Sequence, residues 1–259
     1  MEEIKIKCPA KINLDLRVYP LDKKTGFHPI KSIMQTINLY DYLTIKIKEG
    51  NSIKLEGNSD EIPYDEKNIC FFAIEAFLNK IGQKKEVEVY IEKNIPVCAG
   101  LAGGSTDAAG VLFALNKLFD YPLSLTELNE LAYTLGSDLN FCLIGGTKLC
   151  QGRGEKITQM PFFSFDLTLV KPKNLKISAF EAYSAFDKLK TESNLRNDLE
   201  FALIDKYEEL KYLNSLGMQM SGSGPTFFIR QKKLDFEIDK KNYLVIENLS
   251  STDKGVEEL

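Results

Sequence analysis

Residues 95–109, with the sequence IPVCAGLAGGSTDAA, constrain the fold of this 259-residue chain more than any other stretch. They follow an alternating apolar and polar run at residues 86–92, typical of a half-buried strand. They lead into the apolar residues 108–115, which predict a buried helix. Glycine permits positive φ angles and close approach of a ligand. The N–H groups at a helix start carry partial positive charge and have no partner within the helix. The stretch therefore predicts a binding site for a chain of phosphate groups.

The spacing of the glycines indicates which type of phosphate-binding loop this stretch resembles. A plain loop before a helix is a common alternative. The stretch has no Gly-Lys-Ser/Thr ending, which excludes a Walker loop. Residues 100–104 also lack the glycine spacing of the dinucleotide fingerprint. The remaining pattern, Pro-x-x-x-Gly-Leu-x-Gly-Gly-Ser-Thr-Asp-Ala-Ala, closely resembles the phosphate-binding motif of the GHMP small-molecule kinases.

Charge and hydrophobicity exclude two classes of partner. The formal net charge is −4, whereas a domain that binds nucleic acid is usually basic. One small anionic ligand remains compatible, because local N–H groups and a lysine are sufficient to hold it. No apolar run approaches the ~20 residues needed to cross a membrane. The first residues lead directly into strand-like sequence without a signal pattern, so we expect a cytoplasmic protein.

The chain has five cysteines, and they do not show the paired spacing of a metal site. Their odd number predicts that they are reduced thiols. Cys98 lies within the glycine-rich stretch, where a reactive thiol is conceivable. Free cysteine usually packs as a small apolar side chain. We therefore expect Cys98 to be buried.

Residues 8–16, CPAKINLDL, predict an interrupted strand near the start of the chain. Pro9 cannot donate a ladder hydrogen bond, so it predicts a bulge or an edge position. Lys11 and Asn13 are two residues apart and would share one face of the strand. A solvent-facing Lys11 is the simpler alternative, because an inward lysine requires a partner. The segment Pro-Ala-Lys-Ile-Asn-Leu resembles the first GHMP kinase motif, which favours the inward orientation.

Two further segments resemble motifs of the same family, in the family's order. Residues 136–142, GSDLNFC, resemble the segment that carries the catalytic aspartate, with Asn140 in place of the usual proline. Asp138 can alternatively cap the next turn, a common use of aspartate. Residues 221–225, SGSGP, resemble the third motif, a glycine turn between strands near the substrate.

The chain's only histidine lies in a segment that resembles one subfamily, the cytidine-diphosphate-methylerythritol kinases. Residues 26–30, GFHPI, are similar to the subfamily turn that contacts cytosine, with Phe27 in place of tyrosine. Phenylalanine still stacks on a base but offers no hydroxyl. The resemblance also places Tyr183 against the cytosine, with ordinary helix packing as the alternative. It places Asn68 near adenosine, although Asn68 equally suits a helix cap.

The resemblance to GHMP kinases implies an α+β fold of two domains, whereas composition and periodicity alone give only mixed α and β. The expected division is residues 1–160, with the glycine-rich ATP loop, and residues 161–259, with a ferredoxin-like domain. The polar tail at residues 250–259 is expected to be frayed.

The implied reaction is ATP-dependent phosphorylation of the 2-hydroxyl of 4-diphosphocytidyl-2-C-methyl-D-erythritol, with ATP and Mg²⁺ as cofactors. The alternatives are another GHMP kinase, such as homoserine kinase, and a non-catalytic nucleotide-binding protein. Because a binder needs no base, Lys11 and Asp138 argue against the second alternative. The expected partner is a small molecule, without nucleic acid or membrane, and the expected assembly is a monomer or weak homodimer.

The resemblance assigns roles to individual residues of this chain. Asp138 is the expected base, Lys11 its partner, and Ser105 a candidate ligand of Mg²⁺. The expected ATP-binding residues are Asn68, Pro96, Val97, Cys98, Ala99, Gly100, Leu101, Ala102, Gly103, Gly104, Ser105 and Thr106. The expected substrate-binding residues are Asn13, Phe27, His28, Tyr183, Gly222 and Ser223.

Overall fold

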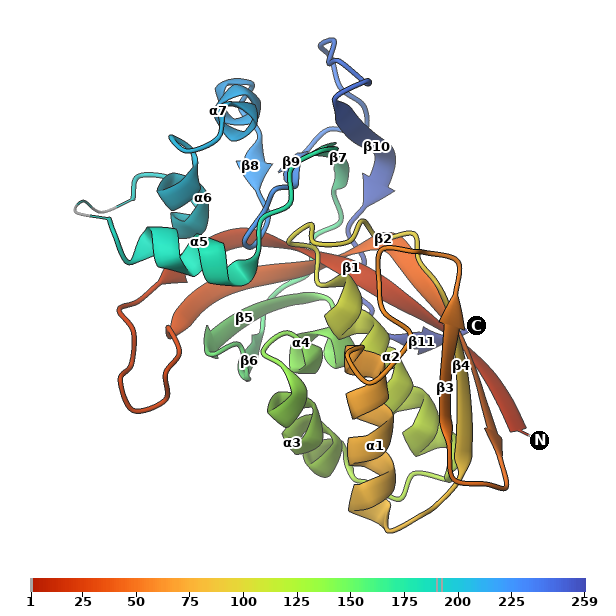
Figure 1. Ribbon diagram of the computed structural model, residues 1–259. Coiled ribbons are helices and arrows are strands. Elements are labelled where there is room, and N and C mark those ends of the chain that lie inside the picture. Colours follow the sequence, from red (N-terminus) through yellow and green to blue (C-terminus); the bar gives the residue numbers. More distant parts are fainter. Residues whose placement is uncertain (1, 190, 192) are drawn as a thin grey trace.

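The computed structural model describes residues 2–189, 191 and 193–259, and two sheets organise them. The larger sheet has seven strands and the smaller has four. Helices α1 to α4 lie together against the larger sheet, and helices α5 to α7 lie beside the smaller one (Figure 1). The mixed α and β content agrees with the expected α+β class.

A long antiparallel hairpin forms the centre of the larger sheet. One arm pairs with β11, and the other pairs with β4 and β5. The pairing register shifts between Pro9 and Ala10, which confirms the predicted bulge, and again between Asn13 and Asp15. The strands of this sheet before its final member are β1 (Glu2–Val18), β2 (Ile30–Lys48), β3 (Ile53–Gly57), β4 (Glu86–Glu92), β5 (Thr147–Gly152) and β6 (Lys156–Gln159).

Apolar faces of the helices pack on this sheet to form the main core. Gly110 is the point where α2 approaches β1 most closely, since a Cβ there would collide with the Cys8 sulfur. Ser124, followed three residues later by Glu127, predicts a capping box, and the two residues form it at the start of α3. The four helices are α1 (Ile69–Ile81), α2 (Gly103–Leu118), α3 (Leu125–Leu135) and α4 (Leu139–Ile144).

The smaller sheet is antiparallel, with the strand order β10-β7-β9-β8. This order agrees with a ferredoxin-like domain. Residues 230–242, which form its second crossover, contain no helix. Its elements are β7 (Asp166–Pro172), α5 (Ala179–Phe186), α6 (Asp198–Leu203), α7 (Glu208–Ser215), β8 (Gln219–Met220), β9 (Phe227–Ile229) and β10 (Tyr243–Ser250). The division into domains at residues 160 and 161 stays a prediction.

The sequence of residues 194–203 predicts a helix, but α6 begins four residues later, at Asp198. Asn197 has an extended backbone conformation, and its side-chain oxygen accepts the N–H groups of Leu199 and Glu200. Asparagine favours this capping geometry over the helix interior. The cap therefore excludes residues 194–197 from α6.

The tail is ordered, so the prediction of frayed residues 250–259 was wrong. Its last strand, β11 (Glu257–Glu258), pairs antiparallel with β1 through Ile6 and Lys7. The Val256 side chain is buried, and its N–H donates to the Cys142 carbonyl at 3.1 Å. This one apolar residue and the open edge of β1 hold the tail, a contact that polar composition alone did not indicate.

The smaller sheet and helices α5 to α7 form the smaller lobe, and Glu200 makes the stability of this lobe depend on pH. Its side chain is 1% exposed, and it accepts hydrogen bonds from the Met220 N–H and the Asn214 amide. Burial raises the pKa of Glu200 from 4.5 to about 6. The folded state therefore holds this proton more tightly than the unfolded state does. The stabilising contribution of the protonated Glu200 is fully present below pH 4.5 and is lost as pH rises through 6, which amounts to about 2 kcal/mol.

We expect Glu200→Gln to remove this pH-dependent step, because glutamine does not ionise. Urea unfolding of both proteins between pH 4.5 and 7 measures the effect. The difference between their free energies of unfolding should change by about 2 kcal/mol across that range. Parallel pH profiles for the two proteins would contradict the prediction.

Candidate active site

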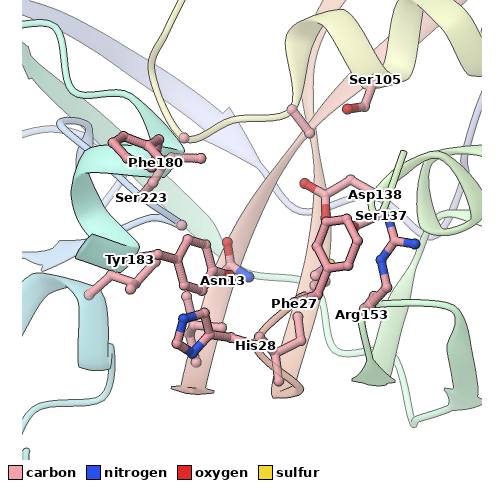
Figure 2. Close-up of a pocket in the computed structure, with 18 of the residues that line it drawn as sticks. Asn13, Phe27, His28, Ser105, Ser137, Asp138, Arg153, Phe180, Tyr183 and Ser223 are labelled. Atoms are coloured by element: carbon pink, nitrogen blue, oxygen red, sulfur yellow. The ribbon is translucent and has the colours of Figure 1, made fainter. Parts of the chain in front are cut away.

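A cavity of about 700 Å³ lies where the long hairpin, the starts of α2 and α4, and the smaller lobe meet (Figure 2). Most of the residues predicted from separate motifs line this one cavity. They are Lys11, Asn13, Phe27, His28, Gly100, Ala102, Ser105, Asp138, Tyr183, Gly222 and Ser223. The structure therefore brings together residues that are far apart in sequence.

Lys11 faces inward, as the sequence predicted. It is 4% exposed, and its Nζ donates to the Asn13 side-chain oxygen at 2.7 Å and to the Gly100 carbonyl at 3.1 Å. The Asp138 carboxylate lies 3.7 Å from the same Nζ. These partners compensate the burial of the charge, and they fix the ammonium beside the glycine-rich loop.

Asp138 keeps its carboxylate available to the cavity. It precedes α4, but its side chain makes no capping hydrogen bond there. The side chain is 27% exposed and lies on the same side as Ser137 and the cavity (Figure 2). The capping alternative is therefore wrong, and the half-buried carboxylate beside Lys11 is confirmed.

The glycine-rich loop is shorter than predicted, because α2 already begins at Gly103. Its first turn contains no acidic residue, and no side chain caps it. The free N–H groups and the helix dipole consequently favour an anion at this end. Ser105 lies in this turn and lines the cavity.

The third motif packs directly against the glycine-rich loop. Gly100 has a φ of 71°, and a Cβ there would collide with the Ser221 carbonyl. The Ser221 hydroxyl donates to the Gly100 carbonyl at 2.9 Å. The turn between β8 and β9 thereby brings Gly222 and Ser223 to the cavity wall.

Aromatic side chains form the end of the cavity remote from α2. His28 Nδ1 lies 2.8 Å from the Tyr19 carbonyl, so this nitrogen donates and carries the hydrogen. The Tyr183 ring stacks on His28 with a centroid separation of 5.3 Å and an interplanar angle of 24°. Burial raises the pKa of Tyr183 to about 12, so its hydroxyl stays protonated at neutral pH.

Residues 68–146 match the family description "GHMP kinases N terminal domain". A protein of Clostridioides difficile (strain 630) named 4-diphosphocytidyl-2-C-methyl-D-erythritol kinase is 39% identical over 292 aligned positions, covering 99% of this chain and 98% of that protein. A protein of the same name from Clostridium beijerinckii is 38% identical, covering 93% and 97%. The chain belongs to the 4-diphosphocytidyl-2-C-methyl-D-erythritol kinase family.

Solved structures agree with this family membership. A crystal structure of 4-(cytidine 5'-diphospho)-2C-methyl-D-erythritol kinase superposes with a TM-score of 0.70 at 29% identity, covering 87% of this chain and 89% of that one. Homoserine kinase from Cytophaga hutchinsonii superposes with a TM-score of 0.72 at 17% identity, covering 100% and 98%. The second likeness concerns the fold alone.

Several residues that the family resemblance singled out do not line the cavity. Asn68 caps α1, accepting the Cys70 N–H at 2.9 Å and donating to the Pro63 carbonyl at 2.6 Å. Its expected contact with adenosine stays a prediction. The others are the loop residues Pro96, Val97, Cys98, Ala99 and Leu101 and the helix residues Gly103, Gly104 and Thr106.

Cys98 is exposed, so the prediction of a buried cysteine was wrong. Its backbone has a φ of 51°, in a turn before the buried residue Ala99. In this turn the Cys98 residue is exposed to solvent, and Ala99 packs in the interior instead. The other four cysteines are buried, and all five are free, as expected for reduced thiols.

Sequence reasoning missed Arg153, which lines the cavity. Its guanidinium carbon lies 3.7 Å from the Phe27 ring centroid and 5.0 Å from that of Tyr133. The only signal in the sequence was an arginine flanked by Gly152 and Gly154 in a predicted turn. That pattern indicates a turn, but it does not indicate that the arginine contacts Phe27.

A buried ion cluster beneath α2 was also missed. Lys93 Nζ donates to Asp107 at 2.7 Å and also bonds Asp41, which in turn accepts the N–H groups of Asn94 and Ile95. Burial raises the pKa of Asp107 well above its usual range. A Cβ on Gly103 would lie 3.2 Å from the Lys93 Nζ, so the cluster packs against the start of α2.

Within the part of the chain that the structure describes, no group of three or more His, Cys, Asp and Glu side chains is placed to hold a metal. Among the same residues, every helix is too short or too polar to cross a membrane.

Ala102 occupies a left-handed backbone conformation, with φ 59° and ψ 28°. This conformation costs about 1–2 kcal/mol for a residue with a Cβ, and glycine loses about 0.4–1 kcal/mol more entropy on folding. We expect Ala102→Gly to raise the free energy of unfolding by about 0.5–1 kcal/mol, measured by urea unfolding. Ala108→Gly in the interior of α2 is the matched control and should lower it. A destabilised Ala102→Gly variant would contradict the prediction.

Proposed function

We propose that this chain transfers the γ-phosphoryl group of ATP to the 2-hydroxyl of 4-diphosphocytidyl-2-C-methyl-D-erythritol. The observation that carries the proposal is the convergence of Lys11 and Asp138 between the glycine-rich loop and the aromatic end of one cavity. Membership of a kinase family implies use of ATP, and the names of the relatives support this alcohol as substrate.

The phosphates of ATP would bind at the start of α2. Residues 100–106 offer backbone N–H groups, an uncapped helix start and the Ser105 hydroxyl. Mg²⁺ is usually held by one or two protein oxygens together with phosphates and water, which fits a site without a dedicated acidic cluster among the described residues. Ser105 would hold the ion, which supplies charge neutralisation to the phosphates.

Proton transfer belongs to Asp138. Its half-exposed carboxylate can accept the proton of the attacking hydroxyl. Lys11 lies 3.7 Å away, and its positive charge stabilises the oxygen as negative charge develops there. Asn13 and Gly100 hold the ammonium, so little reorganisation is needed during the reaction. Phosphoryl transfer depends mainly on such positioning and charge stabilisation.

The cytosine would bind at the aromatic end, with Phe27 and Tyr183 as stacking faces. His28 Nδ1 donates to the Tyr19 carbonyl and Nε2 lies 3.5 Å from the Asp187 carboxylate, so the imidazole is held at this end of the cavity beside Tyr183. Gly222 and Ser223 line the cavity as well, and we assign them to the substrate side.

A substrate comparison tests the proposal. The purified protein is incubated with Mg-ATP and either the cytidine compound, homoserine or mevalonate, and release of ADP is followed. We expect turnover with the cytidine compound alone. Turnover with another alcohol instead would overturn the substrate, and no turnover with any alcohol would favour a nucleotide-binding protein without activity. An Asp138→Asn preparation controls for contaminating kinases.

A further inference from the structure

Phe27 is an exposed ring that nevertheless has to present a defined face to a base. It lies in the connection between β1 and β2, where it is bridged to Asp22, and the residue is 47% exposed. The Asp22 N–H donates to the Phe27 carbonyl at 3.0 Å, which orders the backbone of the turn but not the ring. A half-exposed ring without lateral support loses rotational freedom when a ligand stacks on it, which weakens binding.

Arg153 provides the lateral support. Its guanidinium carbon lies 3.7 Å from the centroid of the Phe27 ring and 5.0 Å from that of Tyr133 on α3, so it is within cation–π distance of both rings. Figure 2 shows Phe27 between Arg153 and Tyr183. The Arg153 guanidinium makes no ion pair with a carboxylate of the described residues, and its buried Nε has no hydrogen-bond partner among them. Its charge therefore acts on the aromatic faces.

The turn that carries Arg153 is fixed against the segment that carries Asp138. The backbone N–H of Arg153 donates to the Glu155 carboxylate at 2.6 Å. Gly154 has a φ of 127°, and a Cβ there would lie 2.6 Å from the Ser137 carbonyl. Gly154 and Ser137 are thus the point where the two loops touch. Arg153 precedes Gly154 in one loop, and Asp138 follows Ser137 in the other.

We propose that Arg153 is a positioning residue, which holds the Phe27 ring as one wall of the base site in register with Asp138. The inference rests on the proposed function, because it assumes that a base stacks on Phe27. Arg153 acts through the ring and makes no contact with the phosphates of the substrate. The same loop contact then fixes the distance between the base wall and the carboxylate.

Binding of cytidine and of cytidine diphosphate to wild type, Arg153→Met and Arg153→Lys tests the proposal by calorimetry. Loss of a cation–π contact predicts that Arg153→Met raises the Kd of cytidine about 3- to 30-fold. The Kd of cytidine diphosphate should rise by the same factor. Arg153→Lys keeps the charge without the flat guanidinium, so it should recover part of the affinity. The KM for ATP should change less than about twofold, because ATP binds at the other end.

A double-mutant cycle with Phe27→Leu separates support of the ring from direct contact. Once the ring is gone, Arg153→Met should have no further effect. An effect that persists in Phe27→Leu, or that is larger for the diphosphate than for cytidine, would overturn the proposal in favour of a phosphate contact. An unchanged Kd in Arg153→Met would also overturn it.

The matched control is Arg230→Met. Arg230 lies over the Phe165 ring at 4.7 Å, and neither residue lines the cavity. This variant should bind both ligands as wild type does. Failure of wild type itself to bind cytidine would overturn the proposed base site, whereas binding that does not depend on Arg153 would overturn only this inference.

Discussion

Replacing Asp138 with asparagine should lower kcat by about 10²- to 10⁴-fold, the usual contribution of a positioned proton acceptor. Asparagine keeps the shape of the side chain beside Lys11 and α4 but cannot take up the proton. The KM for ATP should change less than kcat, because Asp138 is linked to the glycine-rich loop through Lys11, which keeps its own hydrogen bond to the Gly100 carbonyl. Steady-state release of ADP, with each substrate varied in turn, measures both constants.

Asp205→Asn is the control for the Asp138 prediction, because it changes the same net charge at an exposed position of the smaller lobe. It should leave kcat and both KM values unchanged. A kcat for Asp138→Asn within tenfold of wild type would exclude Asp138 as the proton acceptor. An equal rise in the KM for ATP would instead indicate that the carboxylate supports nucleotide binding.

Replacing Lys93 with methionine should lower the free energy of unfolding by about 3–5 kcal/mol, because it removes the cation from buried carboxylates. Asp41 and Asp107 are both buried, and Lys93 bonds both of them. Burial already raises the pKa of Asp107, and loss of Lys93 removes the group that favours its charged form. Urea unfolding at neutral pH measures the loss.

Lys54→Met is the matched control for Lys93. Lys54 also bonds two carboxylates, Glu86 and Glu88, but its side chain is 55% exposed. Exposed ion pairs contribute about 0–1 kcal/mol, so this variant should remain close to wild type. Equal losses in the two variants would show that burial does not set the strength of the Lys93 cluster.

The sequence predicted the residues to which we assign the reaction better than it predicted the residues that support them. Lys11, Asp138 and the glycine-rich stretch were identifiable because their spacing matches recurring motifs, and a charged residue beside apolar strand residues requires a partner. Arg153 and the partners of Lys93 could not be inferred in this way. Their roles depend on contacts between segments 126 residues apart (Phe27 and Arg153) or 52 residues apart (Asp41 and Lys93), which local periodicity does not encode.

The errors have physical causes as well. Cys98 is a small apolar residue by type, but the positive φ of its turn places it on the surface. The helix expected from residue 194 was shortened by the Asn197 cap. The tail looked polar, but its pairing with the edge of β1 and the burial of Val256 order it. In each case a local backbone conformation, a side-chain cap or a distant strand decided the outcome, and residue type alone did not indicate it.

The pairing of β11 with β1 has a consequence for biosynthesis. Ile6 and Lys7 are made early, but their partners Glu258 and Glu257 emerge about 250 residues later. At about 5–20 residues per second, that interval lasts roughly 12–50 s. Throughout it the growing polypeptide carries an unpaired strand edge, the kind of surface that templates aggregation. The nascent chain is therefore most vulnerable, and most dependent on chaperones, until translation reaches residue 258.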